Sequence, residues 1–425
     1  MGLRLLFVAA LVVGSHAILV RTRPSKIAVL NYHSISSDPT WLRIGDKLSL
    51  SPEAFERQLA YLSRRGYRTL FISELHQMLA GKKEFERGRR YVALTFDDGY
   101  ADNWVAAFPL LREYGMKATL FISTDFIDPA DRTRPRFEHA KDSRSELEWE
   151  GYLTWPELRQ MHASGLIEIQ SHGTQHARVF CRDKLISFVS PRRINLWLFW
   201  EERPKSRTRW WLDLPGDTSL LGHPLFPQKS ALAARAYRPD PDAVAYLRQW
   251  AVRRGEPFFR SNDWEDQLRR EWKTFLDEHG DHSVWESEDA YAVRVKEELS
   301  RSRWLLEERL GVPARFLCWP ENEFSPLSER LAREVGFTAT VSNDHNTSNV
   351  VGKVPGRISR VWVGQRGCAV AQKHCEFVDF VARLRVFEGC CIWYPVRVAI
   401  SVFTLLSRAL RRRFSCSVGS SSNWE

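Results

Sequence analysis

The chain has few cysteines and no cysteine pattern of the kind that stabilises a small domain. Its seven cysteines are an odd number at irregular positions, and no two of them form a Cys-x-x-Cys pair. This pattern excludes a zinc knuckle and a disulfide framework as the basis of the fold. The fold must therefore rest on a hydrophobic core, for which 425 residues and 44% apolar content suffice. That length fits one large barrel with an insertion, or two domains.

The sequence also lacks an apolar run long enough to span a bilayer comfortably. The N-terminal run Leu5–Val20 has 16 residues, short of the ~20 that a transmembrane helix needs, and arginines follow it at once. Small residues stand before a cleavage point after Ala17, as in secretory signals. Residues 1–22 are predicted to be a signal peptide or a membrane anchor, with a buried strand as the third alternative. The protein is therefore expected to be secreted, periplasmic or membrane-associated.

Acidic residues are outnumbered by basic ones, which gives a formal net charge of +10 and a pI near 9.3. The arginines recur at several places and do not form a single tail. Such a charge attracts anionic surfaces, and an acidic polysaccharide or an anionic lipid fits it equally well. No nucleic-acid-binding motif accompanies the charge, so nucleic acid is not an expected partner.

Two adjacent acids follow a short apolar run, and this stretch organises the chain. Tyr91–Phe96 is typical of a buried strand, and Asp97, Asp98 and Gly99 come directly after it. Adjacent carboxylates at the end of a buried strand repel each other and lose solvation, unless a cation or a role in chemistry compensates. This arrangement favours a metal site.

Two histidines four residues apart supply the second half of that site. The run Leu166–Gln170 leads as a strand into Ser171–His176. We expect His172 and His176 to lie on one face of a helical turn, from which both imidazoles can reach one metal ion.

Thr95–Gly99 and Ser171–His176 resemble the first two signature motifs of the polysaccharide deacetylases, carbohydrate esterase family four. The resemblance covers residues 26–177 and 291–363. It implies an α/β fold, a distorted (β/α)7-type barrel, here with a large and mainly helical insertion. It also implies one divalent metal, zinc first with nickel, cobalt or iron as alternatives. The activity that it implies is removal of N-acetyl groups from amino sugars, with an N-acetylated glycan as the substrate.

The resemblance also implies a role for each matched residue. Asp98, His172 and His176 would hold the metal, and three protein ligands leave one coordination position open, as catalytic zinc sites require. Asp97 would be the general base. The backbone N–H of Tyr100 would stabilise the developing oxyanion.

His33 is the candidate general acid. It ends the predicted strand Lys26–Leu30, close to the barrel face where such folds build active sites. The branch of the family that includes the poly-N-acetylglucosamine deacetylases carries a Tyr-His pair here, with circularly permuted motifs. The alternative is a core histidine that hydrogen-bonds to a backbone carbonyl.

A later strand end, Phe316–Pro320, is expected to form part of the substrate wall. Where the family shows proline, an aromatic residue and glycine, this chain has Pro320 followed by Glu321 and Asn322. Trp319 and Pro320 therefore become the predicted substrate-binding residues of this wall, together with Tyr100. Arg357 and Arg360 flank the predicted last strand and could orient a carboxylate, although a solvated basic edge is the preferred interpretation.

Two regions lie outside the family pattern. Residues 178–290 form a basic insertion with eight of the 17 tryptophans, which suits either sugar stacking or, as the preferred interpretation, a helical subdomain with tryptophan in its core. Residues 390–414 are predicted to form an amphipathic helix with arginines at its end. Such a helix fits an anionic membrane surface or docking on the barrel equally well.

Two rival functions remain open on the sequence alone. The first is a metal hydrolase on the same fold that acts on an O-acetyl ester or a non-sugar amide. The second is a catalytically inactive protein that binds glycan through its tryptophan-rich insertion. The presence of all five proposed active-site side chains argues against the second.

Overall fold

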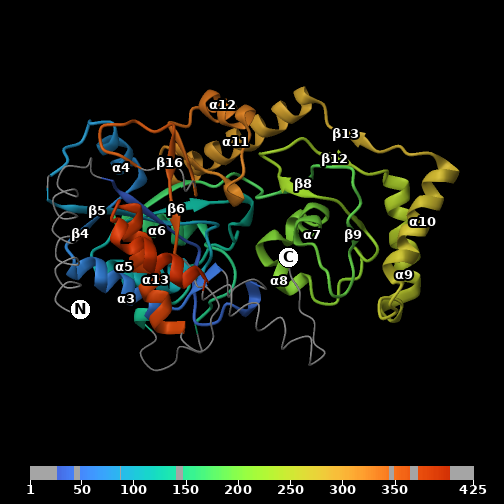
Figure 1. Ribbon diagram of the computed structural model, residues 1–425, viewed down its shortest axis with the longest axis horizontal. Coiled ribbons are helices and arrows are strands. Elements are labelled where there is room, and N and C mark those ends of the chain that lie inside the picture. The colour runs from blue at the N-terminus through green and yellow to red at the C-terminus, as the bar shows by residue number, and fades with distance from the viewer. Residues whose placement is uncertain are drawn as a thin grey trace, which may run out of the picture.

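The computed structural model describes residues 26–42, 48–86, 88–139, 147–343, 349–363 and 372–402 (Figure 1). The predicted signal or anchor at residues 1–22 lies outside the described residues. So does the part of the predicted C-terminal helix that follows residue 402.

A parallel sheet forms the centre of the molecule. In spatial order its strands are β16 (Arg357–Ser359), β15 (Ala339–Ser342), β14 (Phe316–Cys318), β7 (Ile167–Ser171), β6 (Ala118–Ile122), β5 (Arg90–Phe96), β1 (Ala28–Tyr32) and β17 (Val361–Trp362), with β4 (Tyr67–Leu70) beside β5. A single residue, Arg360, joins β16 and β17, although they stand at opposite ends of this order. The sheet must therefore curl until its ends meet. This nearly closed barrel confirms the predicted fold class.

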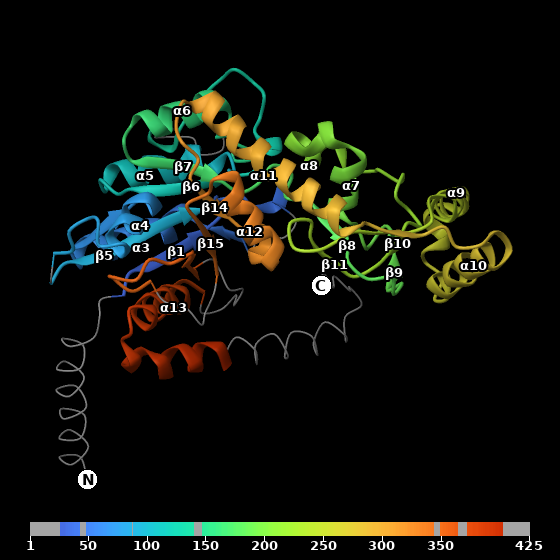
Figure 2. The same ribbon diagram turned by 90° about the horizontal axis from the view of Figure 1, so that it is seen from above.

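Helices cover the outside of the barrel (Figure 2). They are α3 (Pro52–Arg64), α4 (Ile72–Leu79), α5 (Phe108–Glu113), α6 (Trp155–Ala163), α11 (Glu288–Leu310), α12 (Pro326–Val335) and α13 (Gln372–Phe387). Local signals start them, since Ser51 caps α3 in front of Pro52 and Thr154 forms a capping box with Glu157 on α6. Strands β1 and β6 are buried throughout, as expected where helices cover a parallel sheet.

The insertion is a small subdomain beside the barrel (Figures 1 and 2). Its helices are α7 (Leu196–Glu202), α8 (Trp210–Asp213), α9 (Pro241–Phe258) and α10 (Trp264–His279), and its strands are β8 (Arg178–Phe180), β9 (Ser187–Phe188), β10 (Pro224–Leu225), β11 (Gln228–Ser230), β12 (Tyr237–Arg238) and β13 (Val284–Trp285). Trp210 and Trp272 are buried in its core. The preferred interpretation of this region therefore agrees with the structure.

Short elements complete the described fold. They are strands β2 (Ser34–Ile35) and β3 (Ser49–Leu50), the π-helical turn η2 (Asn103–Ala107), and the 3-10 turns η1 (Thr40–Leu42), η3 (Thr124–Phe126), η4 (Phe137–His139), η6 (Pro204–Arg209), η7 (Pro320–Asn322) and η8 (Cys391–Trp393). The last strand, which the sequence predicts as one element over residues 358–363, is in fact two, because Arg360 separates β16 from β17. Within the described residues, no helix combines the length and the apolar character needed to cross a membrane.

Candidate metal and catalytic site

Asp98, His172 and His176 converge where β5 and β7 end. The Oδ1 atom of Asp98 lies 3.4 Å from His172 Nε2 and 3.6 Å from His176 Nε2. This oxygen is buried and has no hydrogen-bond partner among the described residues. Burial by itself raises the pKa of Asp98, but the two imidazoles hold it well below its usual range. A buried, ionised oxygen facing two ring nitrogens fits a divalent cation.

The backbone adopts the left-handed conformation directly after β5. Asp98 has φ of 71° and Gly99 has φ of 80°, so the chain turns sharply after β5 and leaves the Asp98 carboxylate at the barrel mouth. For a non-glycine residue this conformation is costly, and such strain tends to gather at functional sites.

The predicted helical turn around the histidines is wrong. Residues 172–177 form an irregular loop after β7, in which Gly173 has φ of 77° and His176 has φ of 47°. In this loop the two imidazole centroids lie 5.3 Å apart. The spacing predicted two imidazoles beside one another, while the backbone that achieves this is not helical.

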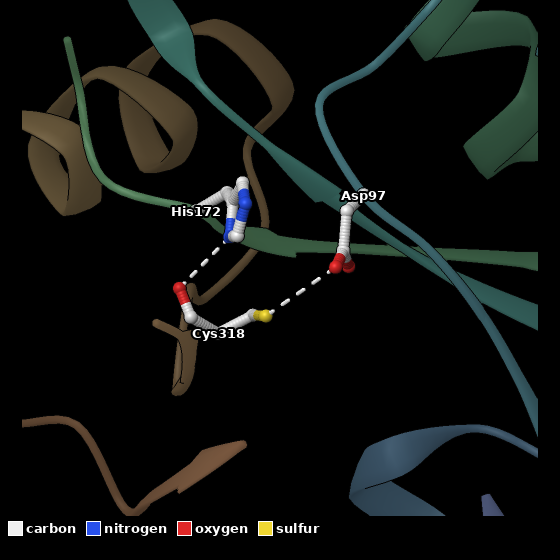
Figure 3. Close-up of side chains that lie close together, drawn as sticks. All are labelled: Asp97, His172 and Cys318. Atoms are coloured by element: carbon white, nitrogen blue, oxygen red, sulfur yellow. Dashed lines mark hydrogen bonds between the residues drawn. The ribbon is translucent and has the colours of Figure 1, made fainter. Parts of the chain in front are cut away.

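A backbone carbonyl fixes the orientation of His172. Its Nδ1 lies 2.9 Å from the carbonyl oxygen of Cys318 (Figure 3). Because a carbonyl only accepts hydrogen bonds, Nδ1 carries a proton, and Nε2 is the ring nitrogen that faces Asp98. Such a bond on the far ring nitrogen is the usual support of a metal-binding histidine.

Asp97 is held by a buried arginine. Arg360 donates from Nη1 to Asp97 Oδ1 at 2.6 Å and from Nη2 to Oδ2 at 2.8 Å, and both residues are about 2% exposed or less. Burial by itself raises the pKa of Asp97, but Arg360 outweighs it and holds the pKa below its ordinary value. Asp97 is therefore ionised at neutral pH.

Arg360 corrects the expectation of a solvated basic edge. It is 1% exposed and points into the barrel, whereas Arg357 lies partly exposed and pairs with Glu329. The signal for Arg360 was present, since one cation inside a buried strand needs an acidic partner, and the paired acids supply it. No local sequence pattern links Arg360 to Asp97.

Cys318 is a second residue of the site that no sequence pattern indicates. Its thiol donates to Asp97 Oδ2 at 3.8 Å, so this residue contacts both Asp97 and His172 (Figure 3). Asp97, His172 and Cys318 also lie close enough to suggest a second cluster of metal ligands. We do not assign a cation there. Arg360 already donates to both oxygens of Asp97, and its positive charge would repel a metal ion.

His33 lies beside Asp97. Its Nε2 is 3.8 Å from Asp97 Oδ2, and its side chain is 16% exposed. Burial lowers the pKa of His33, and the nearby carboxylates of Asp97 and Asp98 oppose this only in part. Its Nδ1 has no partner among the described residues, so a carbonyl-bound core histidine finds no support at that atom.

Two of the predicted substrate-binding residues, Tyr100 and Trp319, are buried. Tyr100 is 6% exposed and packs against Trp41 and Tyr152, while Trp319 is fully buried beside Phe324. Their roles in substrate binding stay predictions.

The segment after Trp319 begins with a buried residue and continues with two residues in a strained backbone conformation. Pro320 is buried, and its ring approaches the loop at Gly173. The next two residues, Glu321 and Asn322, have φ of 55° and 63°. Glu321 forms an ion pair with Arg178 of the insertion.

Comparison with known proteins gives one matching family model, described as polysaccharide deacetylase, over residues 85–197. The chain is 41% identical over 100 residues to YxkH of Bacillus subtilis, whose name describes it as a polysaccharide deacetylase. This match covers 24% of this chain and 33% of that protein. It is 26% identical over 144 residues to the poly-β-1,6-N-acetyl-D-glucosamine N-deacetylase of Escherichia coli K12. This match covers 34% of this chain and 20% of that protein. The matches thus span a third and a fifth of the curated relatives.

Solved structures with a similar arrangement include a de-N-acetylase from Aggregatibacter actinomycetemcomitans and the BpsB deacetylase domain from Bordetella bronchiseptica. Both have 18% sequence identity and a TM-score of 0.48. They cover 79% and 80% of this chain, and 94% and 97% of their own.

Proposed function

We propose, from the polysaccharide deacetylase domain that this chain carries, that it hydrolyses N-acetyl groups of amino sugars with one divalent metal ion held by Asp98, His172 and His176. The observation that carries this proposal is the buried, unpartnered Asp98 Oδ1 facing two imidazole nitrogens. Zinc suits one carboxylate and two imidazoles, and nickel, cobalt or iron are the alternatives. We assign residues 26–177 and 291–363 to the catalytic barrel and 178–290 to the insertion.

A metal ion bound there would activate water and polarise the amide carbonyl. The protein's own side chains then manage the protons. Asp97 Oδ2, ionised through its pairing with Arg360, accepts the proton of the attacking water. The C–N bond breaks, and the amide nitrogen needs one proton to leave as an amine.

His33 supplies that proton. Its lowered pKa means that it is neutral before reaction, so Asp97 and His33 together can take up one proton and hold it between them. The proton that water gives to Asp97 passes to His33 Nε2 and from there to the leaving nitrogen. Acetic acid and an amine are the products, which ionise to acetate and an ammonium group in water, and both side chains return to their starting states.

The backbone N–H of Tyr100 is the proposed donor to the oxyanion. Its neighbours are committed, since Gly99 N donates to Asp97 O and Ala101 N donates to Gly151 O. Among the described residues the Tyr100 N–H makes no such bond, which supports its availability for the reacting carbonyl oxygen.

Acetate release tests the proposal. The full chain, loaded with zinc, should release acetate from N-acetylated chitooligosaccharides or poly-N-acetylglucosamine. The variant His33→Ala should bind as much metal and lose roughly 10²–10⁴-fold in rate, the usual worth of a positioned acid or base. His279→Ala, at an exposed histidine of α10, is the matched control and should behave as the wild type.

Metal-loaded protein that is inert on N-acetylated glycans would contradict the proposed activity. The altered wall at Glu321 and Asn322 would then direct the search toward O-acetyl esters or non-sugar amides. Full activity of His33→Ala would contradict only the proposed acid.

We further propose that the protein acts outside the cytoplasm, with its C-terminal helix on an anionic membrane surface. Residues 394–402 are helical, and Tyr394, Val398 and Val402 lie four residues apart and are 58%, 46% and 49% exposed. Residues at this spacing share one helix face. The sequence adds four arginines between residues 408 and 413, which anionic lipid would attract.

Vesicle binding tests this surface. The full chain should co-sediment with vesicles containing anionic lipid and bind vesicles of phosphatidylcholine alone more weakly. Removal of residues 392–425 should reduce binding at least tenfold, because each basic residue near the surface contributes about 1 kcal/mol. Val398→Asp, in the full chain, should weaken binding without removing any arginine. Equal binding of the full and shortened chains would disprove the contact.

A further inference from the structure

The loop between the two imidazoles, residues 173–175, is held by one carboxylate of α11. The backbone N–H groups of Thr174 and Gln175 both donate to Glu298 Oε1, each at 2.8 Å. The Thr174 hydroxyl also donates to the backbone carbonyl of Glu298 at 2.9 Å. One side chain therefore satisfies two consecutive donors of the loop that joins His172 to His176.

The opposite side of the same loop rests on the turn after β6. Thr124 N donates to Gly173 O at 3.3 Å, and Asp125 N donates to Thr174 O at 2.9 Å. The loop is thus bonded on one side to α11 and on the other to η3, and α11 itself contacts both β7 and η3. Figure 2 shows α11 running along the barrel toward the insertion.

Gly173 allows the close approach to Glu298. A Cβ atom at this position would lie 3.4 Å from Glu298 Oε1, and the φ of 77° is one that side-chain-bearing residues rarely adopt. The loop is therefore packed directly against the carboxylate that binds it.

The insertion enters the same network through Arg207. Its Nη1 donates to Asp125 Oδ2 at 2.9 Å, while Arg301 of α11 donates to Asp125 Oδ1 at 2.8 Å. Arg207 is 5% exposed, whereas the Arg301 side chain is 54% exposed. A buried guanidinium needs its anionic partner more than an exposed one does. Arg207 is therefore the stronger tie between the insertion and the turn that supports the histidine loop.

We propose that Glu298 is a positioning residue that sets the separation of the two imidazoles, and that Arg207 links the insertion to this function through Asp125. The inference rests on the proposed metal set. Metal affinity depends on ligand atoms held within a few tenths of an ångström. The two proposed imidazole ligands, His172 and His176, stand at the ends of the loop that Glu298 binds. The insertion is then part of what builds the metal site, in addition to any contact with substrate.

Metal affinity of the full chain tests the role of Glu298 without reference to substrate. Zinc affinity is measured by competition with a chelator, and the absorption spectrum of the cobalt form reports coordination geometry. Glu298→Ala should lower zinc affinity by about 10–100-fold, as loss of an outer support usually does, and should change the cobalt spectrum. Glu298→Gln keeps the accepting oxygen and should restore both. Glu297→Ala, at an exposed neighbour on α11, should match the wild type.

Arg207 and Arg301 form the second comparison. Arg207→Met should weaken zinc binding more than Arg301→Met does, while Arg207→Lys, which keeps the charge, should retain affinity. Thermal unfolding of each variant shows whether the chain is folded. If Arg207→Met does not fold, the zinc affinity of Arg207→Lys decides the test.

Wild-type affinity and spectrum in Glu298→Ala, or equal losses in Glu298→Ala and Glu298→Gln, would overturn the positioning role. Equal affinities of Arg207→Met and Arg301→Met would overturn the link to the insertion. Wild-type protein that binds no zinc or cobalt would overturn the metal set and the inference together. Protein that binds metal normally but releases no acetate would sink the proposed activity alone and leave the inference standing.

Discussion

Asp97→Asn is expected to lower acetate release by roughly 10²–10⁴-fold while the bound metal stays unchanged. Asparagine keeps the shape of the side chain but cannot accept a proton from water, and Asp97 is not one of the three proposed ligands. Its two oxygens face Arg360, and Asp98 is the residue aimed at the imidazoles. Acetate assays and metal analysis on the same samples check both parts.

The buried ion pair makes a second variant necessary. Removing one charge of a buried pair costs about 3–5 kcal/mol, so Asp97→Asn alone will be less stable because Arg360 loses its counter-ion. The double variant Asp97→Asn/Arg360→Gln leaves two neutral partners and should recover stability in thermal unfolding. It should not recover activity. Restored activity in the double variant, or full activity in Asp97→Asn, would show that Asp97 is not the base.

His176→Ala is expected to abolish stoichiometric metal binding. The substitution removes one of three ligands and leaves the Asp98 carboxylate and His172 without a complete site. Elemental analysis after dialysis, with affinity measured by chelator competition, checks the result. His279→Ala removes an exposed histidine and serves as the control.

The size of the loss in metal binding distinguishes a metal ligand from a residue that only supports the ligands. Loss of the outer support at Glu298 should weaken binding by about 10–100-fold, and loss of a ligand should weaken it further. Equal metal content in His176→Ala and the wild type would remove His176 from the ligand set. Such a result would also remove the reason for the strained backbone at His176, whose φ is 47°.

The features that the sequence determined are those encoded over a few residues. A buried apolar run places the acids Asp97 and Asp98 at a strand end, and a separation of four residues keeps His172 and His176 neighbours. Ser51 and Thr154 cap the helices that begin directly after them. These signals depend on side-chain periodicity and local hydrogen bonds, which any isolated stretch of chain already contains.

The tertiary structure alone decided which distant residues complete the site. Arg360 reaches Asp97 only because the sheet closes on itself between β16 and β17, and Glu298 reaches the histidine loop only because α11 packs along β7. The same packing buries Trp319, which the sequence predicted to form part of the substrate wall. Contacts across more than a hundred residues follow from barrel closure and helix docking, for which no local pattern is a guide. The interior charges of Arg360 and Asp97 pair because burial leaves each no other partner of comparable strength.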